Sequence, residues 1–117
     1  MEQTVKGFFY LATPYSKWKG GIEDAYQMAS REAARLLKAG FPVFCPIAHT
    51  HPMAVFGNID PLAHDIRLPA DKPFMDAAVG LIVLRADGWQ DSYGIGEEIK
   101  TFRAAGKPVL YIDPEQA

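Results

Sequence analysis

The stretch that decides the fold is Val79-Gly80-Leu81-Ile82-Val83-Leu84, an apolar run that ends at Arg85. It does not alternate between apolar and polar residues. This is typical of a strand that is buried on both faces of a sheet. Three shorter apolar runs have the same character, and they lie at residues 7–12, 41–44 and 109–112. The sequence therefore predicts a small sheet whose two faces are both covered.

Helical periodicity separates these apolar runs. Apolar residues recur at three- and four-residue steps from Ile22 to Leu37, and Gly40 follows as a residue suited to a left-handed helix cap. A second, shorter apolar stripe consists of Ile95, Ile99 and Phe102. Strands and helices that alternate in this way form parallel sheets joined by right-handed crossovers.

We therefore predict a single three-layer α/β domain over residues 1–117, of the Rossmann/flavodoxin-like type. Its parallel sheet is expected to have about four to five strands, with helices on both faces. Residues 45–72 lack periodicity and carry prolines at positions 46, 52, 61 and 69. This pattern predicts a long lid or binding loop. A short helix is expected to follow, over Pro73 to Ala77.

Composition excludes several classes of function. The 117 residues carry 12 basic and 14 acidic side chains, a formal net charge of −2, which leaves no basic excess for binding a nucleic acid polymer. The longest apolar stretch, Ala77 to Leu84, is too short to span a membrane. Met1 to Lys6 do not read as a secretory signal, and Cys45 is the single cysteine, so we expect a cytoplasmic protein. Because so short a chain has a limited core, we also expect a homo-oligomer.

The predicted sheet brings polar segments together. Ligands of parallel α/β sheets bind beyond the carboxyl ends of the strands. Three segments follow strands at this edge, at residues 13–21, 45–72 and 85–92. The sequence therefore predicts a binding site where these segments meet.

The sharpest local signal is the junction Gly88-Trp89-Gln90-Asp91-Ser92-Tyr93-Gly94-Ile95-Gly96-Glu97-Glu98. Asp91 or Ser92 can cap the helix that begins there, where free N–H groups favour negative charge. Glu98 lies four residues after Gly94, so its side chain can lean back toward the predicted site. The alternative is that the two adjacent acids only complement the helix dipole.

The motif Ser92-x-Gly94-Ile95-Gly96-x-Glu98-Ile99, followed by residues 106–109 (Gly-Lys-Pro-Val), resembles the nucleophile motif of the nucleoside 2-deoxyribosyltransferase superfamily. That superfamily contains deoxyribosyltransferases and 2′-deoxynucleoside 5′-phosphate N-hydrolases. The form Gly-Trp-x-x-Ser-x-Gly at residues 88–94 is closer still to the branch built on domain of unknown function 1937, DUF1937. Further matches lie at residues 10–16, 46–47 and 71–75, so the resemblance covers nearly the whole chain.

The resemblance implies cleavage or transfer at the N-glycosidic bond of a nucleoside or nucleoside 5′-monophosphate. It places Glu98 as the nucleophile and Asp71 as the acid/base residue. It puts Ser92 and Gly94 at the sugar or its 5′-phosphate. Lys17 and Lys19 are candidates to neutralise that phosphate, or are ordinary surface residues. The predicted substrate-binding residues are Tyr10, Ala12, Thr13, Pro14, Tyr15, Ser16, His49, Trp89, Ser92 and Gly94.

These residue types suit glycosyl chemistry. A carboxylate stabilises or traps the oxocarbenium-like centre, and a second acid protonates the departing base. We expect Glu98 to be ionised near its helix N-terminus, and Asp71 to have a raised pKa beside the apolar Phe74 and Met75. Trp89 can stack on a nucleobase, or can pack under its loop or in a subunit interface.

The sequence leaves two other functions open, and it does not predict a metal site. The same fold can bind a nucleotide without catalysis, or can be a structural, homo-oligomeric protein. His49-Thr50-His51, with His64 and Cys45 nearby in sequence, offers no convincing second pair of zinc ligands. We therefore expect no metal and no cofactor.

Overall fold

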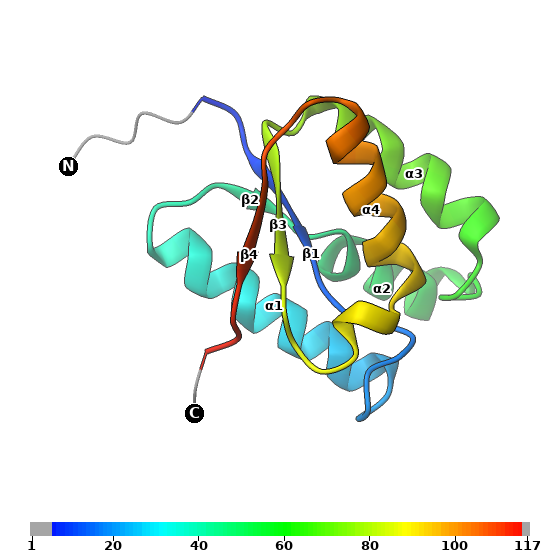
Figure 1. Ribbon diagram of the computed structural model, residues 1–117. Helices are drawn as coiled ribbons and strands as arrows, with labels where there is room; N and C mark the ends of the chain where they lie inside the picture. The colour runs from blue at the N-terminus through cyan, green and yellow to red at the C-terminus, as the bar shows by residue number, and fades with distance from the viewer. Residues whose placement is uncertain (1–5, 116–117) are drawn as a thin grey trace.

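Four parallel strands form one sheet in the order β2-β1-β3-β4 in the computed structural model, which describes residues 6–115 (Figure 1). The strands are β1 (Phe9–Ala12), β2 (Val43–Phe44), β3 (Gly80–Leu84) and β4 (Val109–Ile112). The helices are α1 (Ile22–Lys38), α2 (Pro46–Gly57), α3 (His64–Ala77) and α4 (Tyr93–Ala104), with a short 3₁₀ turn, η1 (Trp89–Asp91), before α4. The predicted parallel α/β fold is confirmed.

Alternate residues of the central strands enter two separate cores. Leu11 of β1 and Ile82 of β3 pack with apolar residues of α1 and the start of α2. Tyr10 and Leu81, their neighbours in sequence, pack with residues of α3 and α4 on the other face. Figure 1 shows α1 and α4 on opposite sides of the sheet. All five residues of β3 are buried, which is why its sequence is apolar without alternation.

The ends of two helices follow the sequence signals. Gly40 has a φ of 92°, the left-handed conformation expected after α1. Ser92 caps α4, because its Oγ accepts a hydrogen bond from the Ile95 N–H at 3.2 Å. Local sequence therefore fixes where α4 begins, directly above the carboxyl edge of the sheet.

The prediction of a long loop over residues 45–72, followed by a short helix at Pro73–Ala77, is wrong. The structure has two helices there, α2 and α3. Pro46 occupies the first turn of α2, where its missing N–H removes no hydrogen bond. Pro52, Pro69 and Pro73 lie inside helices, where each one removes a single donor. Packing offsets that cost, as shown by the rings of Phe74 and Phe44, which stack with their centroids 4.0 Å apart.

No helix within residues 6–115 is long and apolar enough to cross a membrane. Helix α4 buries Ile95 and Phe102 against the sheet. Phe102 of α4 is 1% exposed, and its ring lies 5.6 Å from that of Tyr10 on β1.

Phe102→Ala should therefore lower the free energy of unfolding by about 3–5 kcal/mol, because it leaves a cavity between α4 and the sheet. The matched control is Phe56→Ala, whose ring is 89% exposed and whose loss should change stability by less than about 0.5 kcal/mol. Urea denaturation of both variants measures the difference. Equal effects would show that α4 does not depend on this contact.

Candidate functional site

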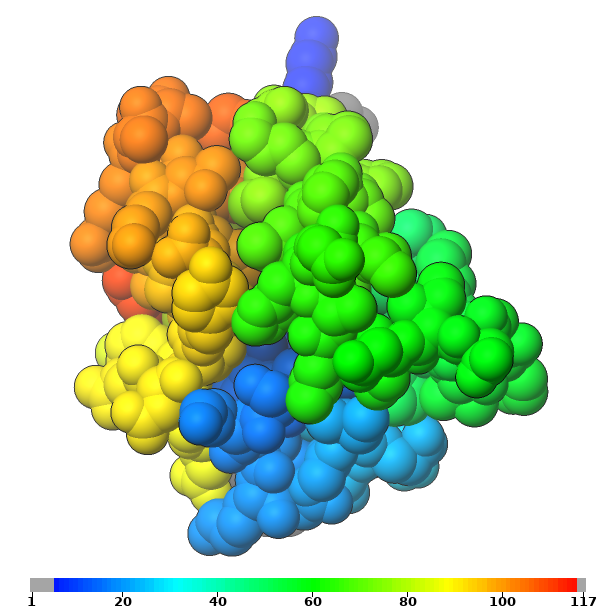
Figure 2. Space-filling model, turned by 90° about the vertical axis from the view of Figure 1, so that its right-hand side faces the viewer, coloured from blue at the N-terminus to red at the C-terminus, as the bar shows by residue number. Residues whose placement is uncertain are grey.

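A pocket opens at the carboxyl edge of the sheet, where the segment after β1 meets α2, α3 and α4. Figure 2 shows the hollow between α3, α4 and the blue segment that follows β1. Of the predicted site residues, the segment after β1 contributes Thr13, Tyr15 and Ser16, and the start of α4 contributes Ser92 and Gly94. The predicted convergence of these segments at one edge is therefore found.

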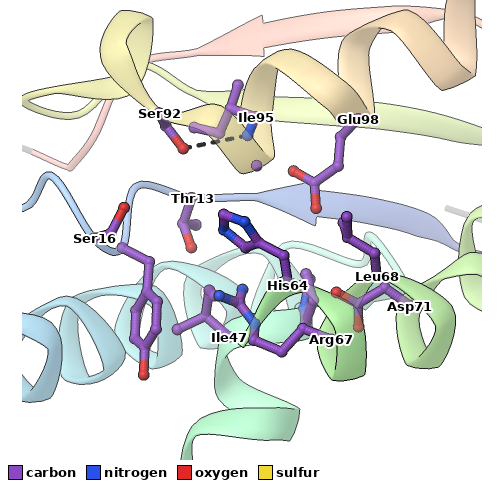
Figure 3. A pocket seen from close by; sticks show the side chains of 13 residues that line it. Thr13, Ser16, Ile47, His64, Arg67, Leu68, Asp71, Ser92, Ile95 and Glu98 are labelled. Atoms are coloured by element: carbon purple, nitrogen blue, oxygen red, sulfur yellow. Dashed lines mark hydrogen bonds between the residues drawn. The ribbon is translucent and has the colours of Figure 1, made fainter. Parts of the chain in front are cut away.

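The two predicted catalytic acids line this same pocket from different helices. Glu98 comes from α4 and Asp71 from α3, and Figure 3 shows both carboxyl groups on the same side of the hollow. The Tyr10 hydroxyl, which reaches the site from the middle of β1, donates a hydrogen bond to Glu98 Oε2 at 2.7 Å. Tyr10 itself is fully buried. It therefore belongs to the core and touches the site only through its hydroxyl.

Burial raises the pKa of the Glu98 carboxyl to about 8. The hydrogen bond from Tyr10 acts against this rise, the nearby Asp71 adds to it, and the Arg67 charge lowers the pKa again. The expectation of an ionised Glu98 is therefore wrong for neutral pH. Glu98 lies in the second turn of α4, beyond the free N–H groups of the first, and surrounding atoms remove most of the water that would stabilise its charge.

Asp71 shows the predicted direction of change. It is 4% exposed, and burial raises the pKa of its carboxyl above 3.8, although the charges of Arg67 and His49 act in the opposite direction. The pKa of the Tyr10 hydroxyl is also raised, by burial first and then by the two acids. Three titratable groups thus share one enclosed place, a common feature of functional sites.

Buried polar atoms without partners gather at the same pocket. Within residues 6–115, three buried side-chain atoms lack a hydrogen-bond partner, namely Thr13 Oγ1, Arg67 Nε and Asp71 Oδ1. All three residues line the pocket. Leaving such an atom unpaired costs about 1–3 kcal/mol, and most buried polar groups are paired. Their convergence leaves this pocket with hydrogen-bonding groups that the described residues do not use.

Five predicted binding residues lie outside the lining: Tyr10, described above, and Ala12, Pro14, His49 and Trp89. Ala12 and Pro14 are buried behind the pocket. His49 packs beside Phe44 and Phe74, with ring centroids 5.3 and 5.6 Å away. The ring of Trp89 lies 5.8 Å from that of Tyr111 and packs on the α4 side of the core. Of the two interpretations of Trp89, the structure favours packing under its loop.

The sequence interpretation missed one face of α3. His64, Arg67 and Leu68 line the pocket together with Asp71. Their spacing of three and four residues, at positions 64, 67, 68 and 71, places them on one side of a helix. This helical spacing can be read from the sequence, but the prolines in the segment led to the prediction of a loop instead.

The lysines proposed for phosphate binding lie elsewhere. Lys19 forms an exposed ion pair with Asp87 at 3.7 Å, and neither Lys17 nor Lys19 lines the pocket. The three histidines are also apart: His49 lies beside Phe44, His51 contacts Tyr15, and His64 stacks on Tyr93. In the described part of the chain, no three His, Cys, Asp or Glu side chains gather in a way that could hold a metal ion.

Fold and site together define a small parallel α/β domain with a paired-acid pocket at the carboxyl edge of its sheet. Residues 7–113 match the domain of unknown function family DUF1937, so the chain belongs to this family. The predicted likeness to that branch is thereby confirmed. No curated protein matches the chain.

The raised pKa of Glu98 predicts how stability depends on pH. The folded protein binds the Glu98 proton more tightly than the unfolded chain, so the free energy of unfolding should fall as pH rises from about 4.5 to about 8, above which Glu98 adds no further decrease. Glu98→Gln removes the charge and should weaken this dependence, giving a variant more stable than the wild type at pH 9. Urea denaturation between pH 5 and pH 9 measures both slopes.

Glu97→Gln is the matched control, because Glu97 lies beside Glu98 but pairs with Lys100 at the surface. In this variant the free energy of unfolding should depend on pH as it does in the wild type. If the stability of Glu98→Gln depends on pH as that of the wild type does, the pKa of Glu98 is not raised in the folded protein.

Proposed function

We propose that this protein cleaves or transfers at the N-glycosidic bond of a nucleoside or nucleoside 5′-monophosphate, with Glu98 as nucleophile and Asp71 as acid/base. The observation that carries the proposal is the pair of carboxyl groups, of the buried Asp71 and the half-buried Glu98, that α3 and α4 direct into one pocket. The resemblance of residues 92–99 to the nucleophile motif of the deoxyribosyltransferase superfamily supports the choice of glycosyl chemistry.

The proposed reaction has two steps. Glu98 attacks the anomeric carbon while the bond to the base breaks, and Asp71 gives its proton to the departing base. The electron pair of the broken bond leaves with the base, and the sugar stays on Glu98 as an ester. In the second step Asp71 takes a proton from water or an incoming base, which attacks the anomeric carbon and releases Glu98. Tyr10 holds Glu98 through Oε2, so Oε1 is the oxygen left to attack.

The proton balance of the pair fits this scheme. Two carboxyl groups in one enclosed pocket titrate as a unit, and the first proton leaves more easily than the second. Burial raises the pKa of Glu98 to about 8, so Glu98 retains a proton at neutral pH, and the proposed scheme takes this as the proton that the pair shares. The reactive arrangement is the one in which Asp71 carries that proton and Glu98 is ionised. Transfer of the proton between the two acids supplies nucleophile and acid together.

A nucleotide-binding module without catalysis is the alternative. The unpartnered atoms of Thr13, Arg67 and Asp71 would serve binding equally well. The pairing of two acids in one pocket and the raised pKa of Glu98 favour an enzyme, because such groups are common where a proton must be held and transferred. Homo-oligomerisation stays a prediction.

Incubation with nucleosides and nucleoside 5′-monophosphates, ribo and deoxy, with and without an acceptor base, should release free base. Glu98→Ala should lower the rate by about 10³-fold or more, because it removes the nucleophile. Asp71→Asn should lower it by about 10²-fold, the usual contribution of a general acid. Chromatography of the released base measures the rate.

Glu97→Gln should keep the rate within about twofold, because its side chain lies outside the pocket. Release that requires the acceptor base would identify a transferase. Thermal stabilisation by these compounds without any base release would instead establish the binding module.

The shared proton predicts a bell-shaped pH profile for base release. The rate should rise at a pH above 3.8, the ordinary Asp value, as the pair loses its first proton and a nucleophile forms. It should fall as pH passes about 8, where the second proton leaves and no acid remains. Asp71→Asn should lose the falling limb. A wild-type rate that still climbs at pH 9 would contradict the shared proton.

A further inference from the structure

Arg67 is a cation at the pocket that has few partners. Its Nη1 donates to the Pro61 carbonyl at 3.2 Å, and its buried Nε has no partner. Among the ion pairs formed by the described residues, none includes Arg67. A half-buried guanidinium normally pairs with an anion, because desolvated charge is costly and its fork of donors suits a carboxylate or phosphate.

The neighbouring lining offers hydrogen-bond donors and little negative charge. Thr13 is 5% exposed and its Oγ1 has no partner. At the start of α4, the N–H groups of Tyr93 and Gly94 precede the first intrahelical hydrogen bond. A side-chain carbon at Gly94 would meet only the Ser92 hydroxyl, 4.0 Å away, so a ligand can approach this backbone closely.

These donors lie on the opposite side of the hollow from the acids. Figure 3 shows Thr13, Ser16 and Ser92 on one side and the Glu98 and Asp71 carboxyl groups on the other. The positive charge of Arg67 acts on both carboxyl groups and lowers the pKa of Asp71 and of Glu98. The pocket is therefore polarised, with a cation and free donors at one end and two acids at the other.

A relay of side chains, which runs from the exposed Glu23 inward through His51 and Tyr15, holds Arg67 in this position. The guanidinium lies over the ring of Tyr15, 5.0 Å from its centroid, in a cation–π contact. The Tyr15 hydroxyl contacts His51 Nδ1 at 2.6 Å, and His51 Nε2 contacts Glu23 Oε1 at 3.0 Å. Because a carboxylate can only accept, Nε2 donates to Glu23, and in that tautomer Nδ1 accepts from Tyr15. Tyr26 stacks on the His51 ring at 4.4 Å and fixes its plane.

We infer that Arg67 is the specificity-determining residue of this site, which binds the phosphate of a phosphate monoester, and that Tyr15, His51 and Glu23 are its positioning residues. The inference rests on the proposed function and deepens it, because it selects the nucleoside 5′-monophosphate over the free nucleoside. Arg67 lies on α3, outside the motifs on which the family resemblance rests. The sugar then spans the pocket, with its phosphate at Arg67 and its anomeric carbon at Glu98.

Equilibrium binding tests this without requiring turnover. Calorimetry with the Glu98→Gln variant uses three probes: a nucleoside 5′-monophosphate, the same nucleoside, and inorganic phosphate as competitor. The monophosphate should bind at least about 10-fold more tightly than the nucleoside, and inorganic phosphate should displace it. Adding Arg67→Met should weaken monophosphate binding by about 10- to 100-fold and change nucleoside binding by less than about twofold. Arg67→Lys should restore part of the loss, since it keeps the charge without the fork.

Two further variants separate positioning from folding. Glu23→Gln changes a side chain that is 63% exposed, so the protein should fold normally, yet monophosphate binding should weaken about 2- to 5-fold as the relay loosens. Arg31→Met is the control for charge, because Arg31 is exposed on α1 away from the pocket, and it should leave binding unchanged.

The outcomes separate this inference from the proposed function. Base release from nucleosides and monophosphates at equal rates, with equal affinities, would overturn the phosphate subsite and leave the glycosyl chemistry standing. Arg67-dependent monophosphate binding with no base release would support the subsite and overturn the enzyme. An equal loss of nucleoside and monophosphate affinity in Arg67→Met would show that Arg67 only supports the fold.

Discussion

The hydrogen bond from the Tyr10 hydroxyl to Glu98 is the contact on which the site depends. Tyr10 is held at the centre of the sheet, with its ring among Phe44 and Phe102, so its hydroxyl has little freedom to move. The bond ties Glu98 of α4 to β1 at 2.7 Å. The apolar core therefore sets the position of the Glu98 carboxyl, in the way that a rigid scaffold preorganises a site.

The same arrangement costs stability. Both acids resist ionisation because they are buried, and three polar atoms at the pocket have no partner within the described residues. A sequence selected for stability alone would replace such groups with apolar or paired residues. This unfavourable burial is concentrated at one pocket, whereas β1 and β3 are packed on both faces. The contrast fits the proposed division between a site and the scaffold that supports it.

The sequence predicted the sheet well and the pocket incompletely, for physical reasons. Burial on both faces leaves an unmistakable apolar strand at residues 79–84, and Gly40 and Ser92 mark helix ends through local chemistry. The prediction failed for residues 45–72 because proline removes helical hydrogen bonds and therefore argues against a helix. Helices α2 and α3 form all the same, because they are stabilised by packing between residues that are distant in sequence. The pKa of Glu98 also depends on enclosure by distant residues, which helix position alone does not reveal.

The organisation of α3 explains how one helix can serve both ends of the pocket. His64, Arg67, Leu68 and Asp71 form a stripe at helical spacing, and the stripe continues into the core at Met75. Where an ordinary surface helix would carry apolar residues all along this face, α3 changes from polar to apolar over about two turns. Arg67 and Asp71 are one turn apart, yet they form no ion pair. Arg67 is instead drawn toward Tyr15, which leaves cation and acid separated across the pocket. In the proposed complex, this separation lets the phosphate of one ligand meet Arg67 while its sugar meets the two acids.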